Sequence, residues 1–152
     1  MLSSDLSYLP LEDCYGTCSP YRATGSGPTQ DAMAISSSAG LNTVRLRLWV
    51  DPSVNTTNGW PGPDYSYANL TSVLALARRA KAAGLFIWLD FHYSDVWADP
   101  GHQYKPSSWA DFTGPILEDA VFNHTYAALK ALEAQATPPS VVQVGNGKQT
   151  AL

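Results

Sequence analysis

The sequence has 152 residues and a net charge of −4, with 45% hydrophobic, 11% aromatic and 14% charged residues. This length suits a single domain, and a chain so rich in apolar and aromatic residues does not have the composition of intrinsic disorder. Nine Lys and Arg residues against thirteen Asp and Glu residues disfavour nucleic-acid binding. Apolar runs such as Leu85–Leu89 are far shorter than the roughly 20 residues of a membrane span.

The first third of the chain predicts one helix and one strand. Residues 1–27 have no sustained hydrophobic period and are expected to be irregular. A short helix is expected over Thr29–Ala39, with Gly40 ending it. Thr43–Val50 alternates between an apolar face and a face of polar and aromatic residues, which is typical of a strand.

The middle of the chain predicts a loop, a helix and a buried strand. After a loop over Asp51–Pro63, a helix capped by Asp64 or Ser66 is expected to run to about Ala83. Gly84 is placed to end it in a left-handed conformation. The nearly continuous apolar run Leu85–Phe91 indicates a strand buried on both faces of a parallel sheet.

The last third predicts another helix and another strand. A polar loop over Tyr93–Ser108 precedes a helix expected around Pro115–Gln135, whose inward face holds Leu117, Val121, Ala128 and Leu132. Val141–Val144 is expected to be the next strand. Alternation of helices and strands, with connections long enough for parallel crossovers, predicts an α/β fold.

Ligands of parallel α/β sheets bind at the carboxyl ends of the strands, so polar residues there are candidates for function. Tryptophan rings beside charged and amide side chains suit a sugar, because rings stack on its apolar faces and polar groups bind its hydroxyls. The candidates at the strand ends and in the following loop are Arg45, Arg47, Trp49, Trp88, Asp90, His92, Asp95, Trp97, Asp99, His102 and Asn146.

Structural interpretations remain open for several of these residues. Arg45 or Arg47 could form an ion pair with Asp90, and strand tryptophans often belong to the core. Asp90, His92 and Asp95 resemble a metal triplet, but the second cluster usual in metal hydrolases is missing from the sequence. Nothing in the sequence calls for a metal or an organic cofactor.

Other motifs point to an oxidising compartment. Asn55, Asn69 and Asn123 each begin an N-glycosylation acceptor triplet, and Cys14 and Cys18 are close enough to form a small disulfide loop or to remain free thiols. We therefore expect an extracellular glycoprotein whose signal peptide is absent from this sequence.

Three segments resemble glycoside hydrolase family 53, the arabinogalactan endo-β-1,4-galactanases. They are GLNTVRLRLWV (residues 40–50), RAKAAGL (79–85) and DFHYSDVWADP (90–100), the last followed by Gln103 and Pro106. Ser3–Asp13 is similar to the opening segment of the family, and Asn123–Tyr126 to its third helix. The resemblance covers residues 1–146, which we interpret as the N-terminal part of a barrel domain, with residues 147–152 as an unrelated C-terminal tail.

The resemblance implies a (β/α)₈ barrel, here only its first four strands, and a retaining hydrolysis of β-1,4-galactan. Retaining glycosidases need two carboxyl groups about 5–5.5 Å apart. In the family the acid/base glutamate directly follows the asparagine that ends strand four, a position held here by Gly147. The segment with the nucleophile is not in the sequence, so we expect a truncated and inactive chain without catalytic residues.

The resemblance implies substrate-binding roles for Arg45, Asp90, His92, Trp97 and Asn146. Asn146 would bind the hydroxyl beside the reacting carbon, His92 with Asp90 would polarise that network, and Arg45 would steady the nucleophile. The expected partner is β-1,4-galactan, with no nucleic acid, no membrane and a monomeric complete enzyme. Two alternatives stay open: a non-catalytic carbohydrate-binding protein, and a glycosidase for another β-1,4-linked polysaccharide.

Overall fold

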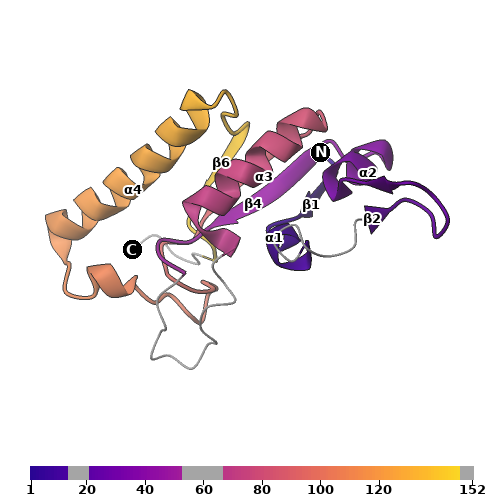
Figure 1. The fold of residues 1–152 in the computed structure, drawn as a ribbon. Coiled ribbons are helices and arrows are strands. Elements are labelled where there is room, and N and C mark those ends of the chain that lie inside the picture. The colour runs from indigo at the N-terminus through magenta and orange to yellow at the C-terminus, as the bar shows by residue number, and fades with distance from the viewer. Residues whose placement is uncertain (14–20, 53–66, 148–152) are drawn as a thin grey trace.

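A four-stranded parallel sheet is the centre of the molecule (Figure 1). The computed structural model describes residues 1–13, 21–52 and 67–147. The strands lie in the order β1-β4-β5-β6, which is also their order along the chain, and each pairs in parallel with its neighbour. Their bounds are Ser3–Asp5 (β1), Thr43–Leu48 (β4), Phe86–Phe91 (β5) and Val141–Val144 (β6). The expected parallel α/β fold is confirmed.

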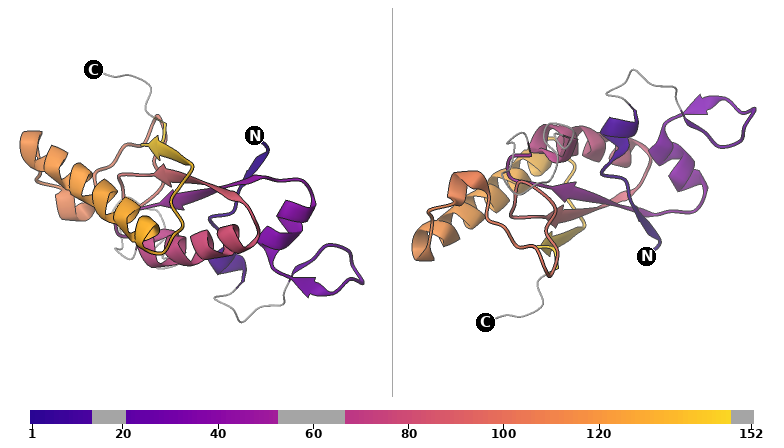
Figure 2. Two further views of the ribbon diagram at one scale, coloured as in Figure 1. Left: turned by 90° about the horizontal axis from the view of Figure 1, so that it is seen from above. Right: turned by 90° about the horizontal axis from the view of Figure 1, so that it is seen from below.

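Two helices cover one face of this sheet. Helix α3 (Leu70–Ala82) joins β4 to β5, and helix α4 (Gly114–Ala134) joins β5 to β6. The two helices contact each other and lie on the same side of the sheet, as the views in Figure 2 agree. The core between them is made of alternate strand residues and of the inward helix faces: Val44, Leu46, Leu48, Ile87, Leu89, Phe91, Val73, Leu76, Ala77, Ala80, Ala128 and Leu132.

Helix α3 shows how local signals set its ends. The side chain of Asn69 accepts a hydrogen bond from the backbone N–H of Ser72, at 2.9 Å, and so caps the first turn. The expected caps, Asp64 and Ser66, lie outside the described residues, and the helix starts later than expected because Asn69 supplies the cap. Gly84 follows the helix with φ +72°, the left-handed conformation expected of it.

The N-terminal region is more ordered than its sequence suggests. Besides β1, it contains a short helix α1 (Leu9–Glu12) and an antiparallel pair, β2 (Tyr21–Arg22) with β3 (Thr29–Gln30). The helix expected from Thr29 is shorter, as α2 (Ala32–Ser38), because the Asp31 side chain caps it by accepting from the backbone N–H of Met33. Elements of two to four residues are too short for hydrophobic periodicity to reveal them.

Among the remaining elements, β6 has the expected bounds, the other boundaries differ from expectation by at most two residues, and two further features differ. The long loop after β5 contains a 3₁₀ helix, η3 (Ser107–Trp109). On α4, Ala128 and Leu132 are buried as expected, whereas Leu117 and Val121 are only half-buried. No helix in the described part of the chain is long and apolar enough to cross a membrane. Cys14, Cys18 and Asn55 lie outside the described residues.

Candidate substrate-binding site

The face of the sheet opposite the helices carries a compact set of charges. Arg45 donates to two carboxylates, with its Nη2 2.6 Å from Asp90 Oδ2 and its Nη1 3.1 Å from Asp5 Oδ2. Arg47, two residues along β4 and therefore on the same face, places its Nη2 2.8 Å from the same Asp5 oxygen. Of the two arginines that sequence allows as ion-pair partners of Asp90, Arg45 is the one that forms the pair.

Asp5 is held as an anion between these arginines. Burial alone would raise the pKa of its carboxyl group, but hydrogen bonds from Ser7 and the charges of Arg47 and Arg45 outweigh burial and lower that pKa below 3.8. Its Oδ1 accepts from the Ser7 hydroxyl at 2.6 Å and from the Ser7 backbone N–H at 3.0 Å. Both carboxylate oxygens of Asp5 therefore accept hydrogen bonds, Oδ1 from Ser7 and Oδ2 from the two arginines.

Asn146 lies just beyond β6, where its amide has a defined orientation. Its Oδ1 accepts from Arg45 and from Gln143, both at 3.2 Å, while its Nδ2 donates to the backbone carbonyl of Ala98. Gln103 donates to the backbone carbonyl of Asn146 at 3.0 Å. Arg45, Asp90 and Asn146, which come from three successive strands, thus meet at the carboxyl end of the sheet.

His92 is fully buried behind Asp90. Its Nδ1 accepts from the backbone N–H of Ala98 at 3.2 Å, so the proton is on Nε2, which donates to Asp90 Oδ2 at 2.9 Å. The imidazole also packs against the rings of Trp49 and Trp97. His92 therefore lies on the face of the sheet opposite the helices, as expected. Because its side chain is fully buried, it acts on the site through its hydrogen bond to Asp90.

The tryptophans have different environments. Trp49 is completely buried in a second core cluster, so it is not a surface for a ligand. Trp88 is half-buried, with the Arg45 guanidinium 5.9 Å from its ring centre. Trp97 is half-buried, and the guanidinium of Arg47 stacks 3.8 Å from its ring centre. One face of Trp97 is therefore covered by a cation.

The acidic residues of the following loop do not join the site. Asp95 is buried and accepts from the backbone N–H groups of Asp51 and Ser107, which clamps the loop. Asp99 pairs with His102 at the surface. The described residues contain no group of three or more His, Cys, Asp or Glu side chains placed to hold a metal ion, so Asp90, His92 and Asp95 do not form the metal triplet that their spacing allows.

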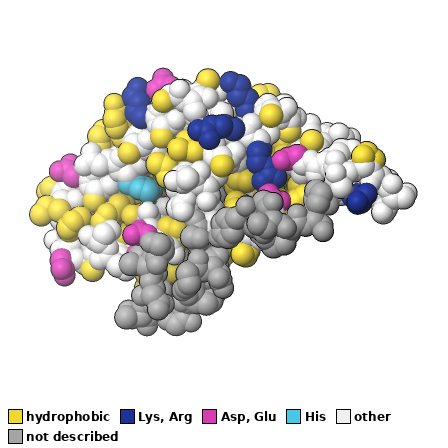
Figure 3. All heavy atoms as spheres, in the orientation of Figure 1, with side chains coloured by type: hydrophobic (Ala, Val, Ile, Leu, Met, Phe, Trp, Pro, Cys, Tyr) yellow, Lys and Arg dark blue, Asp and Glu magenta, His cyan; other side chains and the backbone are white. Residues whose placement is uncertain are grey.

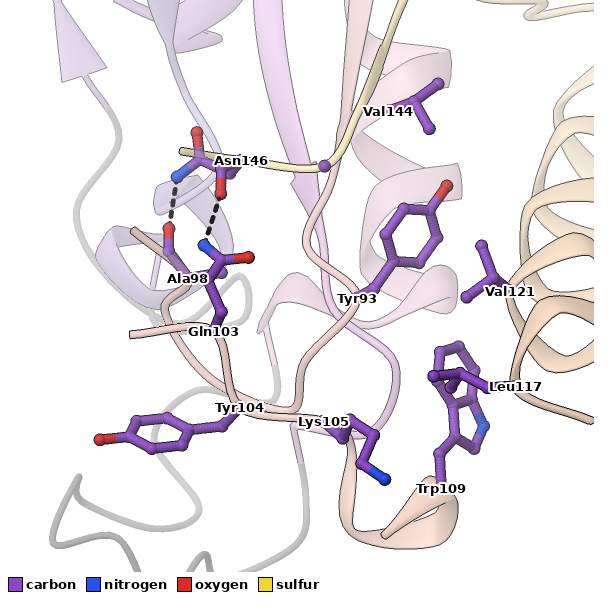
Figure 4. Close-up of a pocket in the computed structure, with 11 residues that line it drawn as sticks. Tyr93, Ala98, Gln103, Tyr104, Lys105, Trp109, Leu117, Val121, Val144 and Asn146 are labelled. Atoms are coloured by element: carbon purple, nitrogen blue, oxygen red, sulfur yellow. Dashed lines mark hydrogen bonds between the residues drawn. The ribbon is translucent and has the colours of Figure 1, made fainter. Parts of the chain in front are cut away.

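A cavity of about 410 Å³ lies beside Asn146, between the loop after β5 and helix α4. Figure 4 shows Asn146 bonded to Ala98 and Gln103 on one side of this space, with Tyr93, Trp109 and two aliphatic residues of α4 on the other. Three aromatic residues line it, Tyr93, Tyr104 and Trp109, together with the amide of Gln103 and the ammonium of Lys105. The lining thus combines aromatic rings with planar polar groups.

Gly147 follows Asn146 in a conformation that leaves no room for a side chain. Its φ of +72° is in the left-handed region, and a Cβ atom there would lie 2.7 Å from Pro100 Cδ and 2.8 Å from the backbone of Asp99. Any residue other than glycine would require the loop after β5 to move.

Two polar residues of this network are not among the candidates from sequence. Gln143 is a single amide within the apolar run of β6, and that contrast is a signal that could have indicated it. Asp5 is in a segment expected to be irregular, and its ion pairs span 40 and 42 residues, so no local pattern reveals them.

Comparison with known proteins agrees with this arrangement. The family model described as glycosyl hydrolase family 53 matches residues 1–152. The chain belongs to glycosyl hydrolase family 53. It is 40% identical over 143 residues to an arabinogalactan endo-β-1,4-galactanase of Thermothelomyces thermophilus, an alignment that covers 93% of this chain and 38% of that protein.

Solved structures of family 53 proteins share the fold. The catalytic domain from Ignisphaera aggregans aligns with a TM-score of 0.81 and 35% identity over 95% of this chain and 38% of its own length. A fungal β-1,4-galactanase aligns with a TM-score of 0.77 and 34% identity, covering 95% of this chain and 40% of that one. The chain thus spans somewhat more than a third of these relatives, and its four strands correspond to part of a (β/α)₈ barrel.

Proposed function

We propose that residues 1–146 are the N-terminal part of the barrel of an endo-β-1,4-galactanase, a retaining glycosidase of β-1,4-galactan, and form its sugar-binding side. The observation that carries this proposal is the meeting of Arg45, Asp90 and Asn146 at the carboxyl end of the sheet in a chain of family 53. Ligands of parallel α/β barrels bind at that end of the strands.

We assign the sugar-binding roles as follows. Asn146 binds the hydroxyl beside the reacting carbon, because Nδ2 of its oriented amide keeps one N–H beyond the one donated to Ala98. Asp90, whose Oδ2 accepts a hydrogen bond from His92 Nε2, polarises that network, and Arg45 supplies positive charge next to the reacting centre. Trp97 offers the ring face that Arg47 does not cover.

We expect the 152-residue chain by itself to bind galactan and not to cleave it. General acid catalysis needs a protonated carboxyl group, and the lowered pKa of Asp5 keeps that group ionised at neutral pH. Asp90 is held by Arg45. The position that follows Asn146, where the family has its acid/base glutamate, is Gly147, and a side chain there would collide with Pro100.

The same observation on Gly147 favours one second candidate, a carbohydrate-binding protein without hydrolytic activity. For the 152-residue chain both candidates expect binding of galactotriose without release of reducing sugar. Release from β-1,4-galactan above background would exclude the second candidate and would contradict the expectation that this chain does not cleave. Gly147→Glu is not expected to restore hydrolysis, because a side chain there would collide with Pro100 and the nearby carboxylates Asp5 and Asp90 are paired with arginines.

The test of sugar binding is titration calorimetry of the chain with β-1,4-galactotriose. Asn146→Ala should weaken binding by about tenfold, since it removes a hydrogen bond to the sugar. Asn123→Ala, on the exposed side of α4, is the matched control and should bind as the unchanged chain does. Equal binding of cellotriose would indicate another β-1,4-linked polysaccharide instead, and no binding of either sugar would refute the proposal.

We also propose that the protein is an extracellular, monomeric glycoprotein that acts on galactan without nucleic-acid or membrane partners. Asn123 is exposed on α4, whereas the Asn69 side chain is half-buried and caps α3. Glycosidase treatment of protein secreted from a eukaryotic host should lower its apparent mass, and Asn123→Gln should remove the larger part of that change. An unchanged mass would contradict the glycoprotein proposal.

A further inference from the structure

Asp5 is the residue that connects two half-buried parts of the candidate site, Asn146 and Trp97. Its Oδ2 accepts from Arg45 at 3.1 Å and from Arg47 at 2.8 Å. These arginines are two positions apart on β4, so their side chains are on one face and their positive charges repel each other. Asp5 is the carboxylate shared by both, which lets them lie side by side.

The first arm of this arrangement runs from Asp5 through Arg45 to Asn146. With Nη1 of Arg45 bonded to Asp5, its Nη2 is directed to Asp90 Oδ2 and Asn146 Oδ1. A cationic donor at Oδ1 sets the sense of the Asn146 amide, because the flipped amide would place its own N–H groups against the guanidinium. The Asn146 amide is therefore oriented through Arg45.

The second arm runs from Asp5 through Arg47 to Trp97. Arg47 is 2% exposed, and its Nε and Nη1 have no hydrogen-bond partner among the described residues. The guanidinium lies instead between two rings, 3.8 Å from the centre of Trp97 and 5.3 Å from that of Tyr8. Its hydrogen bond to Asp5 thus fixes the cation that supports one face of Trp97.

The Asp5 carboxylate is itself fixed in position by Ser7, so it can orient both arginines. The hydroxyl and backbone N–H of Ser7 both donate to its Oδ1, at 2.6 and 3.0 Å. The same hydroxyl accepts from the backbone N–H of Arg47 at 2.8 Å, which ties the end of β1 to β4. Strand β1 pairs directly with β4, with Asp5 opposite Arg45 in the register.

We infer that Asp5 is a positioning residue for sugar binding, which orients Asn146 through Arg45 and Trp97 through Arg47. The inference rests on the proposed galactan-binding function. It assigns no contact between Asp5 and the sugar, and its effect is transmitted through the two arginines.

The first measurement needs no sugar. Arginine side-chain NMR of the free protein should show slowly rotating guanidinium groups for Arg45 and Arg47. Asp5→Asn should abolish the signature of Arg47, speed the rotation of Arg45, which keeps its pair with Asp90, and shift the Trp97 indole signal. Asp13→Asn is the matched control, because Asp13 pairs with Arg79 away from the site. Unchanged Arg45 and Arg47 signals in a folded Asp5→Asn protein would overturn the inference.

The second measurement is galactotriose binding. Asp5→Asn should weaken binding by about tenfold, Asp5→Glu, which keeps the charge, should restore part of it, and Asp13→Asn should leave it unchanged. If Asp5→Asn does not fold, Ser7→Ala keeps the carboxylate but loosens it and should weaken binding by a smaller factor. Equal binding by the unchanged chain and these Asp5 or Ser7 variants would overturn the inference, whereas absence of binding by the unchanged chain would refute the proposed function alone.

Discussion

Strands β4 and β6 belong to the same parallel sheet but have opposite surroundings. β4 has a strand on each side, and its residues are buried on both faces apart from the half-buried Arg45. β6 has a neighbour on one side only, and Val144 on it is 66% exposed. The charges of the candidate site belong mainly to β4 and its neighbours, where each is paired with an opposite charge.

Several of the exposed large hydrophobic residues in the described part of the chain lie at the β6 side. Ile116, Phe122 and Tyr126 on α4 are each more than half exposed, and an open hollow of about 500 Å³ lies between this helix and Val144. Hydrophobic side chains are visible together over this part of the surface in Figure 3. Burial of both apolar and ionic groups is thus concentrated around β4, so substitutions there should cost much more stability than substitutions near β6.

The largest effect is expected from removal of the Asp90 carboxylate. Asp90 is completely buried and pairs with Arg45 and His92, so Asp90→Ala leaves the Arg45 guanidinium without its closest partner. Breaking a buried ion pair from one side typically costs about 3–5 kcal/mol. Urea unfolding of the variant should show this loss. Asp99, which pairs with His102 at the surface, is the control, since Asp99→Ala should leave the unfolding midpoint unchanged.

The next effect compares two positions on α4 itself. Leu132 is fully buried against the core, and Leu132→Ala should cost roughly 2–4 kcal/mol of unfolding free energy through lost burial and a cavity. Phe122 is 64% exposed on the same helix, and Phe122→Ala should change stability by less than about 0.5 kcal/mol. It should instead reduce binding of a hydrophobic dye. Similar destabilisation by both substitutions would contradict the contrast between the two faces.

The same contrast explains which parts of the fold the sequence predicts. Burial on one or both faces imposes an alternating pattern on β4 and a continuous one on β5, and both patterns are local. The sequence therefore predicts these strands to within two residues of their observed ends. β1 has three residues and forms by pairing with β4, about 40 positions away. A local hydrophobic pattern therefore cannot predict it.

Candidate site residues follow the same division. Asp90 and Asn146 are predictable because they come at or just beyond the ends of recognisable strands, and such ends meet at one edge of a parallel sheet. Arg45 is predictable from the alternation of β4, which places it on the polar face. Asp5 is not predictable in this way, because its role depends on the register that places it opposite Arg45. The blocked space at Gly147 depends likewise on the path of the loop near Pro100.

A smaller effect is expected at the start of α3, which packs on β4. The Asn69 side chain accepts from the backbone N–H of Ser72, so Asn69→Ala in unglycosylated protein should cost about 1 kcal/mol. Asn69→Gly should lower the free energy of unfolding by only a few tenths of a kcal/mol, since glycine is tolerated as a cap. Thermal unfolding measures both losses. Asn123→Ala, at an exposed position in the middle of α4, is the control, and no loss of stability is expected there. Equal losses at both asparagines would exclude capping as the cause.

The smallest effect is an acid dependence that comes from Asp5 beside β4. Burial would raise the pKa of Asp5, but the bonds from Ser7 and the charges of Arg47 and Arg45 lower it below 3.8 in the folded protein. A carboxyl group with a lowered folded-state pKa adds stability that is complete above its ordinary value and is lost as the pH falls through the folded value. The side chain keeps 27% exposure, so solvent screening limits the size of this contribution.

Comparison of the unchanged chain with Asp5→Asn isolates this dependence from that of other carboxylates. The free energy of unfolding should decline more steeply in the unchanged chain than in the variant as the pH falls below about 3.8, and the two should run parallel at neutral pH. Phe122→Ala removes no titratable group, so this variant should follow the pH dependence of the unchanged chain. Parallel curves for Asp5→Asn throughout the acid range would show that the arginines do not hold this carboxylate as an anion in solution.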